Sequence, residues 1–169
     1  MTRFRLSAAV LDTPDPRGLA LFYQRLLGWP MRDDEPEWRR LWTDYLAFYE
    51  TRLPEDTYRA TFERLLGDGE FEPRCLLALV KAQPKALVHF LYHRSCWAVA
   101  NNCYLQDLYV DPGLRGTRLG AALIEAVKHD AEARGVTNVH WMTHESNETA
   151  RKLYDRVARR TGFIEYDLS

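Results

Sequence analysis

The sequence predicts an α+β fold in which helices flank a central mixed, mostly antiparallel sheet. Three observations lead to this class. Residues 36–67 carry apolar side chains at helical spacing, and the stretches that follow Pro73 are strand-like and joined by short polar turns. Helical patterns alternate with strands only in the second half of the chain. The 169 residues can bury roughly 70% of the surface exposed by the unfolded chain.

Two helices are expected before the sheet. The stretch PEWRRLWTDYLAFYET places six apolar side chains on one helix face: Trp38, Leu41, Trp42, Tyr45, Leu46 and Tyr49. The stretch LPEDTYRATFERLLGDG repeats the pattern between Pro54 and Gly67, which are a typical start and stop signal. The stretches CLLALVKAQ, KALVHFLYHRSCWAV and NCYLQDLYV are then expected to form an antiparallel meander.

The second half of the chain predicts two more helices and two more strands. One helix begins at about Thr117, has apolar residues four apart, and ends at Gly135. The remaining elements are expected to be a strand NVHWMTHE, a helix NETARKLYDRVARRT and a last strand FIEYDL.

Composition excludes several classes of protein. Lys and Arg total 23 against 24 for Asp and Glu, so there is no basic excess to attract nucleic acid. No apolar run approaches the roughly 20 residues of a membrane span, and the first residues are too acidic and proline-rich for a secretory leader. Cys75, Cys96 and Cys103 lack metal-ligand spacing and are expected to be reduced thiols. We therefore expect a cytoplasmic protein with no membrane, nucleic-acid or metal partner.

Two motifs in the second half resemble the GCN5-related N-acetyltransferase (GNAT) superfamily. The stretch LYVDPGLRGTRLGAAL is similar to the family's strand, glycine turn and helix start, and SNETARKLYDRVARRTGF contains its Asn–Ala–Tyr signature at Asn147, Ala150 and Tyr154. The resemblance covers about residues 32–169 and implies an N-acetyltransferase domain over them. Free N–H groups in the first turn of a helix suit a pyrophosphate, and glycines let the backbone approach it.

The resemblance implies acetyl-CoA as co-substrate and assigns its binding residues. These are Leu108, Tyr109, Val110, Arg115, Gly116, Thr117, Arg118, Leu119, Gly120, Ala121 and Asn147. Arg118 replaces a glycine of the family pattern, which matters if the backbone there needs a positive φ. Four extra residues separate Tyr154 from Gly162, and we expect them to lengthen the last helix by about one turn.

The resemblance also implies two catalytic roles. Tyr154 would donate a proton to the departing thiolate. The general base is open, because Gln106 stands where polyamine-type relatives carry Glu; Asp107 is the first candidate, and Glu145, His144 or a water chain are the others. The implied reaction is direct transfer of acetyl to a primary amine, either on a small molecule or lysine-like.

The acceptor is expected to lie against the stretch LWTDYLAFYETRLPED, where Phe48, Tyr49 and Glu50 could hold a cation. Asp44 is another candidate on this stretch if it is exposed. The first alternative function is a non-catalytic CoA-binding regulatory protein, since Arg118 and Gln106 depart from the family pattern. A dicarbonyl-detoxifying or antibiotic-binding module is the second alternative.

That second alternative depends on residues 1–31 alone. Their pattern resembles the first strand and helix of a glyoxalase-like (vicinal oxygen chelate) module, without a His or Glu on the strand to hold a metal. We expect a structural extension in which residues 3–11 join the sheet and residues 15–27 cover apolar surface. Only one short strand is expected after the last helix, so we also expect a homodimer that completes the sheet between subunits.

Overall fold

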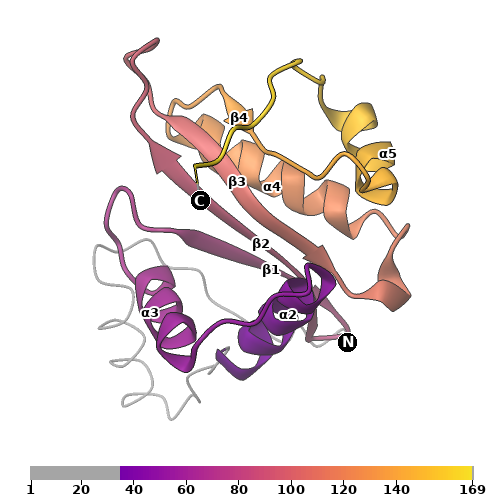
Figure 1. The fold of residues 1–169 in the computed structure, drawn as a ribbon. Coiled ribbons are helices and arrows are strands. Elements are labelled where there is room, and N and C mark those ends of the chain that lie inside the picture. Colours follow the sequence, from indigo (N-terminus) through magenta and orange to yellow (C-terminus); the bar gives the residue numbers. More distant parts are fainter. Residues whose placement is uncertain (1–34, 169) are drawn as a thin grey trace, which may run out of the picture. The chain divides into compact units, whose positions relative to one another are not determined.

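The computed structural model describes residues 35–168, which form a four-stranded sheet between helices (Figure 1). The strand and helix expected within residues 3–27 lie outside the described residues. The described elements, in chain order, are α2 (Glu35–Phe48), α3 (Glu55–Leu65), β1 (Arg74–Val80), β2 (Gln83–His93), β3 (Asn102–Val110), the 3-10 turn η1 (Pro112–Leu114), α4 (Leu119–Ala133), β4 (Val139–His140) and α5 (Glu148–Val157). The strand order is β1-β2-β3-β4, antiparallel except for the parallel β3–β4 pair. The predicted α+β class with a mixed, mostly antiparallel sheet is confirmed.

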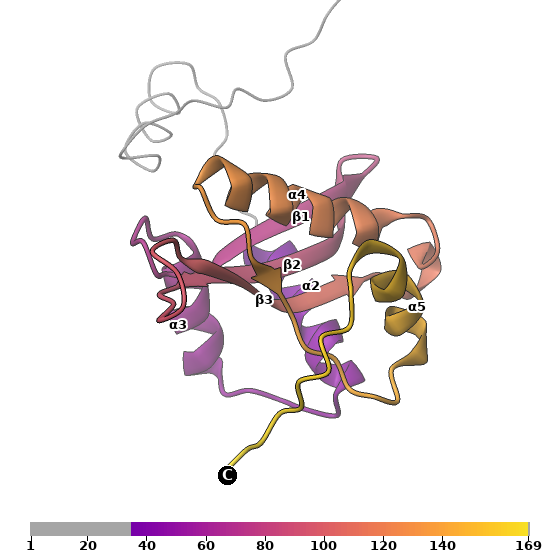
Figure 2. The same cartoon turned by 90° about the horizontal axis from the view of Figure 1, so that it is seen from above.

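The sheet separates two hydrophobic cores. Helix α4 covers one face and helices α2 and α3 cover the other (Figure 2). Leu123, Val127 and Ala131 of α4 are buried against one face, in agreement with their four-residue spacing. Trp38 and Leu41 of α2 are buried against the opposite face. The aromatic face of α2 is therefore mainly core.

A β-bulge in β3 decides which side chains face each core. His89 pairs with Asp107 and Phe90 pairs with Leu105, so Gln106 is an extra residue without a partner on β2. In a regular strand Leu105 and Asp107 would share a face. With the bulge, Leu105 packs in the α4 core, while Asp107 and Tyr109 face α2.

The bulge also explains why β4 is short. The parallel pairing of β3 and β4 is limited to Cys103 with Val139 and Tyr104 with His140, just before the bulge. Beyond this point β3 bends away from the chain that continues after β4. The strand expected over NVHWMTHE is therefore only two residues long.

Two expectations about the last twenty residues were wrong. Helix α5 ends at Val157, so the four extra residues do not lengthen it, and FIEYDL forms no strand. Residues 155–168 are exposed throughout. A short helix gains most of its stability from packing, and a strand needs a partner. The side chains of residues 158–168 are exposed, and no strand of the described sheet pairs with them.

Candidate active site

The opening between β3 and the chain after β4 is the first feature of the site. From residue 105 onward, the edge of β3 that faces away from β2 pairs with no other strand of the described chain. Leu108, Tyr109 and Val110 lie on this part of β3, which leads directly into η1 and α4. The splayed strands therefore place an open strand edge beside a helix start.

The turn before α4 presents amides at its end rather than along its whole length. The amide of Arg115 donates to the Pro112 carbonyl, and that of Thr117 donates to the Leu114 carbonyl, both at 3.3 Å. Both amides are therefore used within the turn. No side chain caps the start of α4, and the N–H groups of a helix's first turn have no intrahelical acceptor. The amides of Leu119, Gly120 and Ala121 are therefore available to a phosphate.

Arg118 occupies a backbone conformation that favours glycine. Its φ is 73° and its ψ is 1°, in the left-handed region, and it forms the N-cap of α4. A residue with a side chain is destabilised there by about 1–2 kcal/mol. The family's glycine at this position thus has a conformational reason, and Arg118 adopts the same conformation at a cost.

Gly120 has a packing role. A Cβ at this position would lie 3.0 Å from Cδ2 of Leu153 and 3.7 Å from Cγ2 of Val110. The missing side chain lets α4 approach α5 and β3 closely. Leu153, which directly precedes Tyr154 on α5, therefore lies close to the start of α4.

Arg115 links the turn to helix α2. Its Nε donates to the Val110 carbonyl at 3.4 Å, and its guanidinium carbon lies 5.7 Å from the centre of the Phe48 ring. A guanidinium over an aromatic face is a favourable cation–π arrangement. The positive charge of Arg115 is therefore held near the end of α2.

A cleft of about 480 Å³ lies between the end of α2 and the start of α5. The residues that line it are Phe48, Tyr49, His144, Ser146, Asn147, Glu148 and Thr149. The α2 side is aromatic, whereas the α5 side offers hydroxyl, amide, imidazole and carboxylate groups. This mixture suits a small polar molecule with an apolar portion.

Asn147 has a structural role in this cleft. Its side-chain oxygen accepts from the Ala150 amide at 3.3 Å, which makes it the N-cap of α5, and its Nδ2 donates to Thr143 Oγ1 at 3.3 Å. Capping explains the three-residue spacing from Asn147 to Ala150 in the signature. The side-chain oxygen and nitrogen of Asn147, which we expected to contact acetyl-CoA, therefore both form hydrogen bonds within the protein.

Tyr154 lies on α5, two turns after the cap. It is half-buried, and its ring centre is 5.4 Å from that of Trp141. Burial raises the pKa of the Tyr154 phenol to about 12, and the neighbouring Tyr49 contributes. Tyr154 is therefore protonated at neutral pH, as a proton donor must be.

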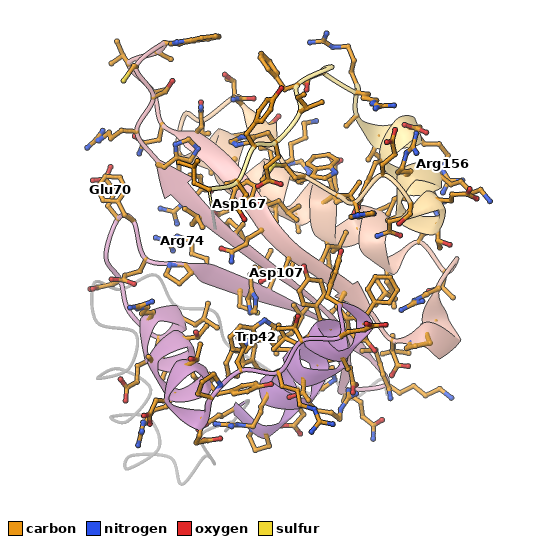
Figure 3. All side chains as sticks on the ribbon, in the orientation of Figure 1. Trp42, Glu70, Arg74, Asp107, Arg156 and Asp167 are labelled. Atoms are coloured by element: carbon orange, nitrogen blue, oxygen red, sulfur yellow. The ribbon has the colours of Figure 1, made fainter. Side chains whose placement is uncertain are left out.

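Asp107 is buried on the α2 side of the sheet, close to Trp42 of α2 (Figure 3). His89 Nδ1 lies 2.9 Å from Oδ2 of Asp107, and Trp38 Nε1 donates to His89 Nε2 at 2.8 Å. Because indole nitrogen only donates, Nε2 must accept and Nδ1 carries the proton that His89 donates to Asp107. His89 is thus fixed in one neutral tautomer.

The structure separates the other candidate bases from Asp107. Glu145 is exposed and its carboxylate lies 3.5 Å from Arg160, and His144 Nδ1 lies 2.6 Å from Ser146 Oγ in the cleft. Glu50 and Asp44 were expected to hold the cationic acceptor; Glu50 is exposed after the end of α2. Asp44, half exposed, forms an ion pair with Arg40 at 3.2 Å.

Sequence reasoning missed the side chains around Asp107, which are His89, Trp38 behind it, and Tyr45, whose pKa is raised by burial and by the charge of Asp107. Trp38 and Tyr45 were interpreted only as members of an apolar helix face, and His89 received no specific role. The single signal was a histidine among apolar residues of β2. Only the β2–β3 register, which depends on the bulge, brings it opposite Asp107.

The opened sheet, the turn before α4 and the capped helix with its tyrosine together define an acyltransferase. The sequence profile of the Acetyltransferase (GNAT) family matches residues 36–158. The chain belongs to this family and is an acyltransferase enzyme.

Several similar proteins are N-acetyltransferases. The chain is 33% identical over 135 residues to the D-amino-acid N-acetyltransferase HPA3 of Saccharomyces cerevisiae, covering 79% of this chain and 83% of that protein. It is 30% identical over 128 residues to the thialysine N-epsilon-acetyltransferase of Sus scrofa, covering 68% and 72%. A ribosomal-protein-alanine N-acetyltransferase structure from Brucella melitensis biovar Abortus 2308 matches with a TM-score of 0.66 and 25% identity, covering 80% and 93%.

Proposed function

We propose that the protein transfers acetyl from acetyl-CoA directly to the primary amine of a small acceptor, with both substrates bound together. The observation that supports this most is the position of Tyr154 beside Tyr49, which lines the cleft. Tyr154 could therefore protonate a thiolate next to the aromatic side of the cleft, where an amine acceptor could approach the thioester. Members of the GNAT family use acetyl-CoA, and the chain has the family's turn and opened sheet to hold it.

Acetyl-CoA would bind with its pyrophosphate at the first turn of α4. The amides of Leu119, Gly120 and Ala121 and the helix dipole would face the phosphates, and Arg115 and Arg118 would add charge. The pantetheine arm would lie along the open edge of β3 at Leu108, Tyr109 and Val110 and pair with the backbone groups that point away from β2. Gly116 and Thr117 would shape the turn, and Asn147 would act by fixing the start of α5.

The chemistry needs a base, an oxyanion donor and an acid. Asp107 would accept a proton from the acceptor ammonium, either through water or through other groups. The amine nitrogen would then attack the thioester carbon, and an amide of the opened β3 edge would stabilise the oxyanion. Tyr154 would protonate the departing thiolate.

We propose a free amino acid or a related small amine as the acceptor. Two similar proteins are named for D-amino acids and thialysine. In the cleft, the Tyr49 face and the Glu148 carboxylate suit an ammonium group, and the hydroxyls of Ser146 and Thr149 suit a carboxylate or hydroxyl.

The experiment that tests this proposal measures free-thiol release from acetyl-CoA across D- and L-amino acids, thialysine and polyamines, alongside calorimetric binding of acetyl-CoA. We expect binding, and turnover with at least one amine. Binding without any turnover would favour the alternative, a non-catalytic CoA-binding regulatory protein. Two features motivate this alternative: the strained Arg118, and Gln106 in place of a glutamate base. No binding at millimolar acetyl-CoA would overturn both.

We further propose that the protein acts in the cytoplasm as a homodimer. No helix within residues 35–168 is long and apolar enough to cross a membrane. The dimer is supported by exposed apolar side chains in residues 163–168 and by β4, which pairs with β3 alone in the described sheet.

A further inference from the structure

The network around Asp107 continues toward the cleft through Tyr45 of α2 and Tyr49 of the turn that directly follows α2. The two tyrosines are four residues apart in the chain. Their ring centres are 5.1 Å apart, in an edge-to-face arrangement. Tyr45 is partly buried beside Asp107, whereas Tyr49 is 42% exposed and lines the cleft. The two phenols therefore span the distance from a buried carboxylate to the acceptor.

We propose that Tyr45 and Tyr49 form the proton path from the acceptor amine to Asp107, and that His89, held by Trp38, is the positioning residue for that carboxylate. The inference rests on the proposed acetyl transfer and replaces an unspecified water chain with named groups. Because Asp107 is buried, its carboxylate does not reach the cleft directly, and the two tyrosines would connect it to the acceptor.

The surroundings of each group fit this role. Asp107 contacts His89 of β2, and its charge contributes to the raised pKa of Tyr45 on α2, of Cys75 on β1 and of Tyr104 on its own strand. Among these, His89 is held neutral by Trp38. No Lys or Arg of the described chain is paired with this carboxylate. Asp107 therefore remains available to receive a proton.

The phenols are suited to pass a proton rather than to hold a charge. Burial raises the pKa of Tyr45, and the charge of Asp107 and the Tyr49 phenol raise it further. A standing phenolate at Tyr45 is accordingly excluded at neutral pH. Each hydroxyl can donate one proton while accepting another.

The proton balance closes. The acceptor ammonium gives a proton to the Tyr49 oxygen, Tyr49 gives its own to the Tyr45 oxygen, and Tyr45 gives its own to Asp107. The nitrogen keeps its electron pair and bonds to the thioester carbon, the C–S bond breaks, and the thiolate takes the Tyr154 proton. The acetylated nitrogen then returns its extra proton to Tyr154. Asp107 releases its proton to solvent through the same path, so one proton leaves per turnover.

The test compares pH profiles of kcat between pH 6 and 10 for the wild type and four single variants. D-Alanine, D-lysine and thialysine serve as acceptors with saturating acetyl-CoA. The variants on the path are Tyr45→Phe, Tyr49→Phe and Asp107→Asn. The matched control is Tyr58→Phe, which removes a buried phenol on α3 that contacts Thr43 and not Asp107.

We expect each path variant to lower kcat at least about tenfold at pH 7. The deficit should shrink toward pH 10, where the acceptor loses its proton to solvent unaided. The Tyr45→Phe, Asp107→Asn double variant should be no slower than the slower single variant, because both interrupt one path. Tyr58→Phe should retain the wild-type profile.

The positioning role of His89 has its own readout. His89→Gln keeps a side-chain N–H for Asp107, whereas His89→Leu does not, so only the leucine variant should show the Tyr45→Phe profile. Wild-type turnover with an unchanged profile in Tyr45→Phe would overturn the path while leaving the proposed function intact. No turnover by the wild type with any of the three amines would overturn this inference together with that acceptor class.

Discussion

Arg118 has two separate effects on the site: its backbone conformation is strained, and its guanidinium supplies a positive charge. Its left-handed backbone strains any residue with a Cβ, but its guanidinium sits at the start of α4, where a phosphate would bind. Glycine would relieve the strain and remove the charge. Asparagine tolerates the left-handed region and also lacks the charge.

Substituting Arg118→Gly should raise the free energy of unfolding by about 0.5–1 kcal/mol, since the relieved strain exceeds the added entropy of the unfolded glycine. Chemical denaturation measures this change. In calorimetry both Arg118→Gly and Arg118→Asn should bind acetyl-CoA about three- to tenfold more weakly than the wild type. Unchanged affinity in both variants would mean that the guanidinium does not reach the ligand.

Tyr154 lends itself to a kinetic test. Tyr154→Phe should lower kcat at least about tenfold and leave the Kd for acetyl-CoA nearly unchanged, because the hydroxyl acts only when the thiolate leaves. Single-turnover thiol release and calorimetry separate the two quantities. A folded variant with wild-type kcat would exclude Tyr154 as the acid.

The raised pKa of Tyr154 also makes stability depend on pH. Its phenol ionises at about 10 in the unfolded chain and at about 12 in the fold. The contribution of Tyr154 is therefore complete below pH 10 and is lost as pH rises toward 12, by at most about 1.4 kcal/mol per pH unit. Denaturation of wild type and Tyr154→Phe at pH 9 and 11 should show a smaller loss in the variant.

Strand β3 shows where prediction from the sequence reached its limit. Its bounds, residues 102–110, agree with the expected stretch, as do the order of the described elements through α4 and the placement of Tyr154 on the last helix. The bulge could not be predicted, because a two-residue alternation assigns Leu105 and Asp107 to one face. The partners of Asp107 depend on that bulge, and they were missed for this reason.

The bulge is directly testable at Gln106. Deleting this residue should force the two halves of β3 into one alternation, so that either Asp107 enters the α4 core or Leu105 leaves it. We expect loss of cooperative unfolding by circular dichroism and no soluble folded species in size-exclusion chromatography. Gln106→Ala keeps the bulge and exposes no new polar group, so its stability should change by less than about 0.5 kcal/mol.

Gln106→Ala also examines the acceptor chemistry. An exposed amide at this position plays no part in the proton path, so kcat should be retained. A large loss of kcat in Gln106→Ala with unchanged stability would instead place this side chain in contact with the acceptor.

The end of the described chain bears on assembly. Residues 163–168 carry Ile164, Tyr166 and Leu168 on alternate positions, with exposures of 71%, 86% and 105%, and acidic residues between them. This alternation is typical of a strand with one buried face, yet no element of the described chain covers it. A segment with this alternation can add as a strand to the sheet edge of another copy, and β4 is an edge strand of the described sheet.

We therefore expect a symmetric homodimer in which residues 163–168 of each subunit add to the sheet of the other. Light scattering at micromolar concentration should give about 40 kDa, twice the 19.8 kDa of one chain. Ile164→Asp with Tyr166→Asp should yield a monomer, because two charges cannot be buried on the apolar face. Glu165→Gln, at the intervening position of the same segment, is the matched control and should leave the dimer intact. A wild-type mass near that of one chain at high concentration would contradict the pairing, and the exposed apolar face would then require another partner.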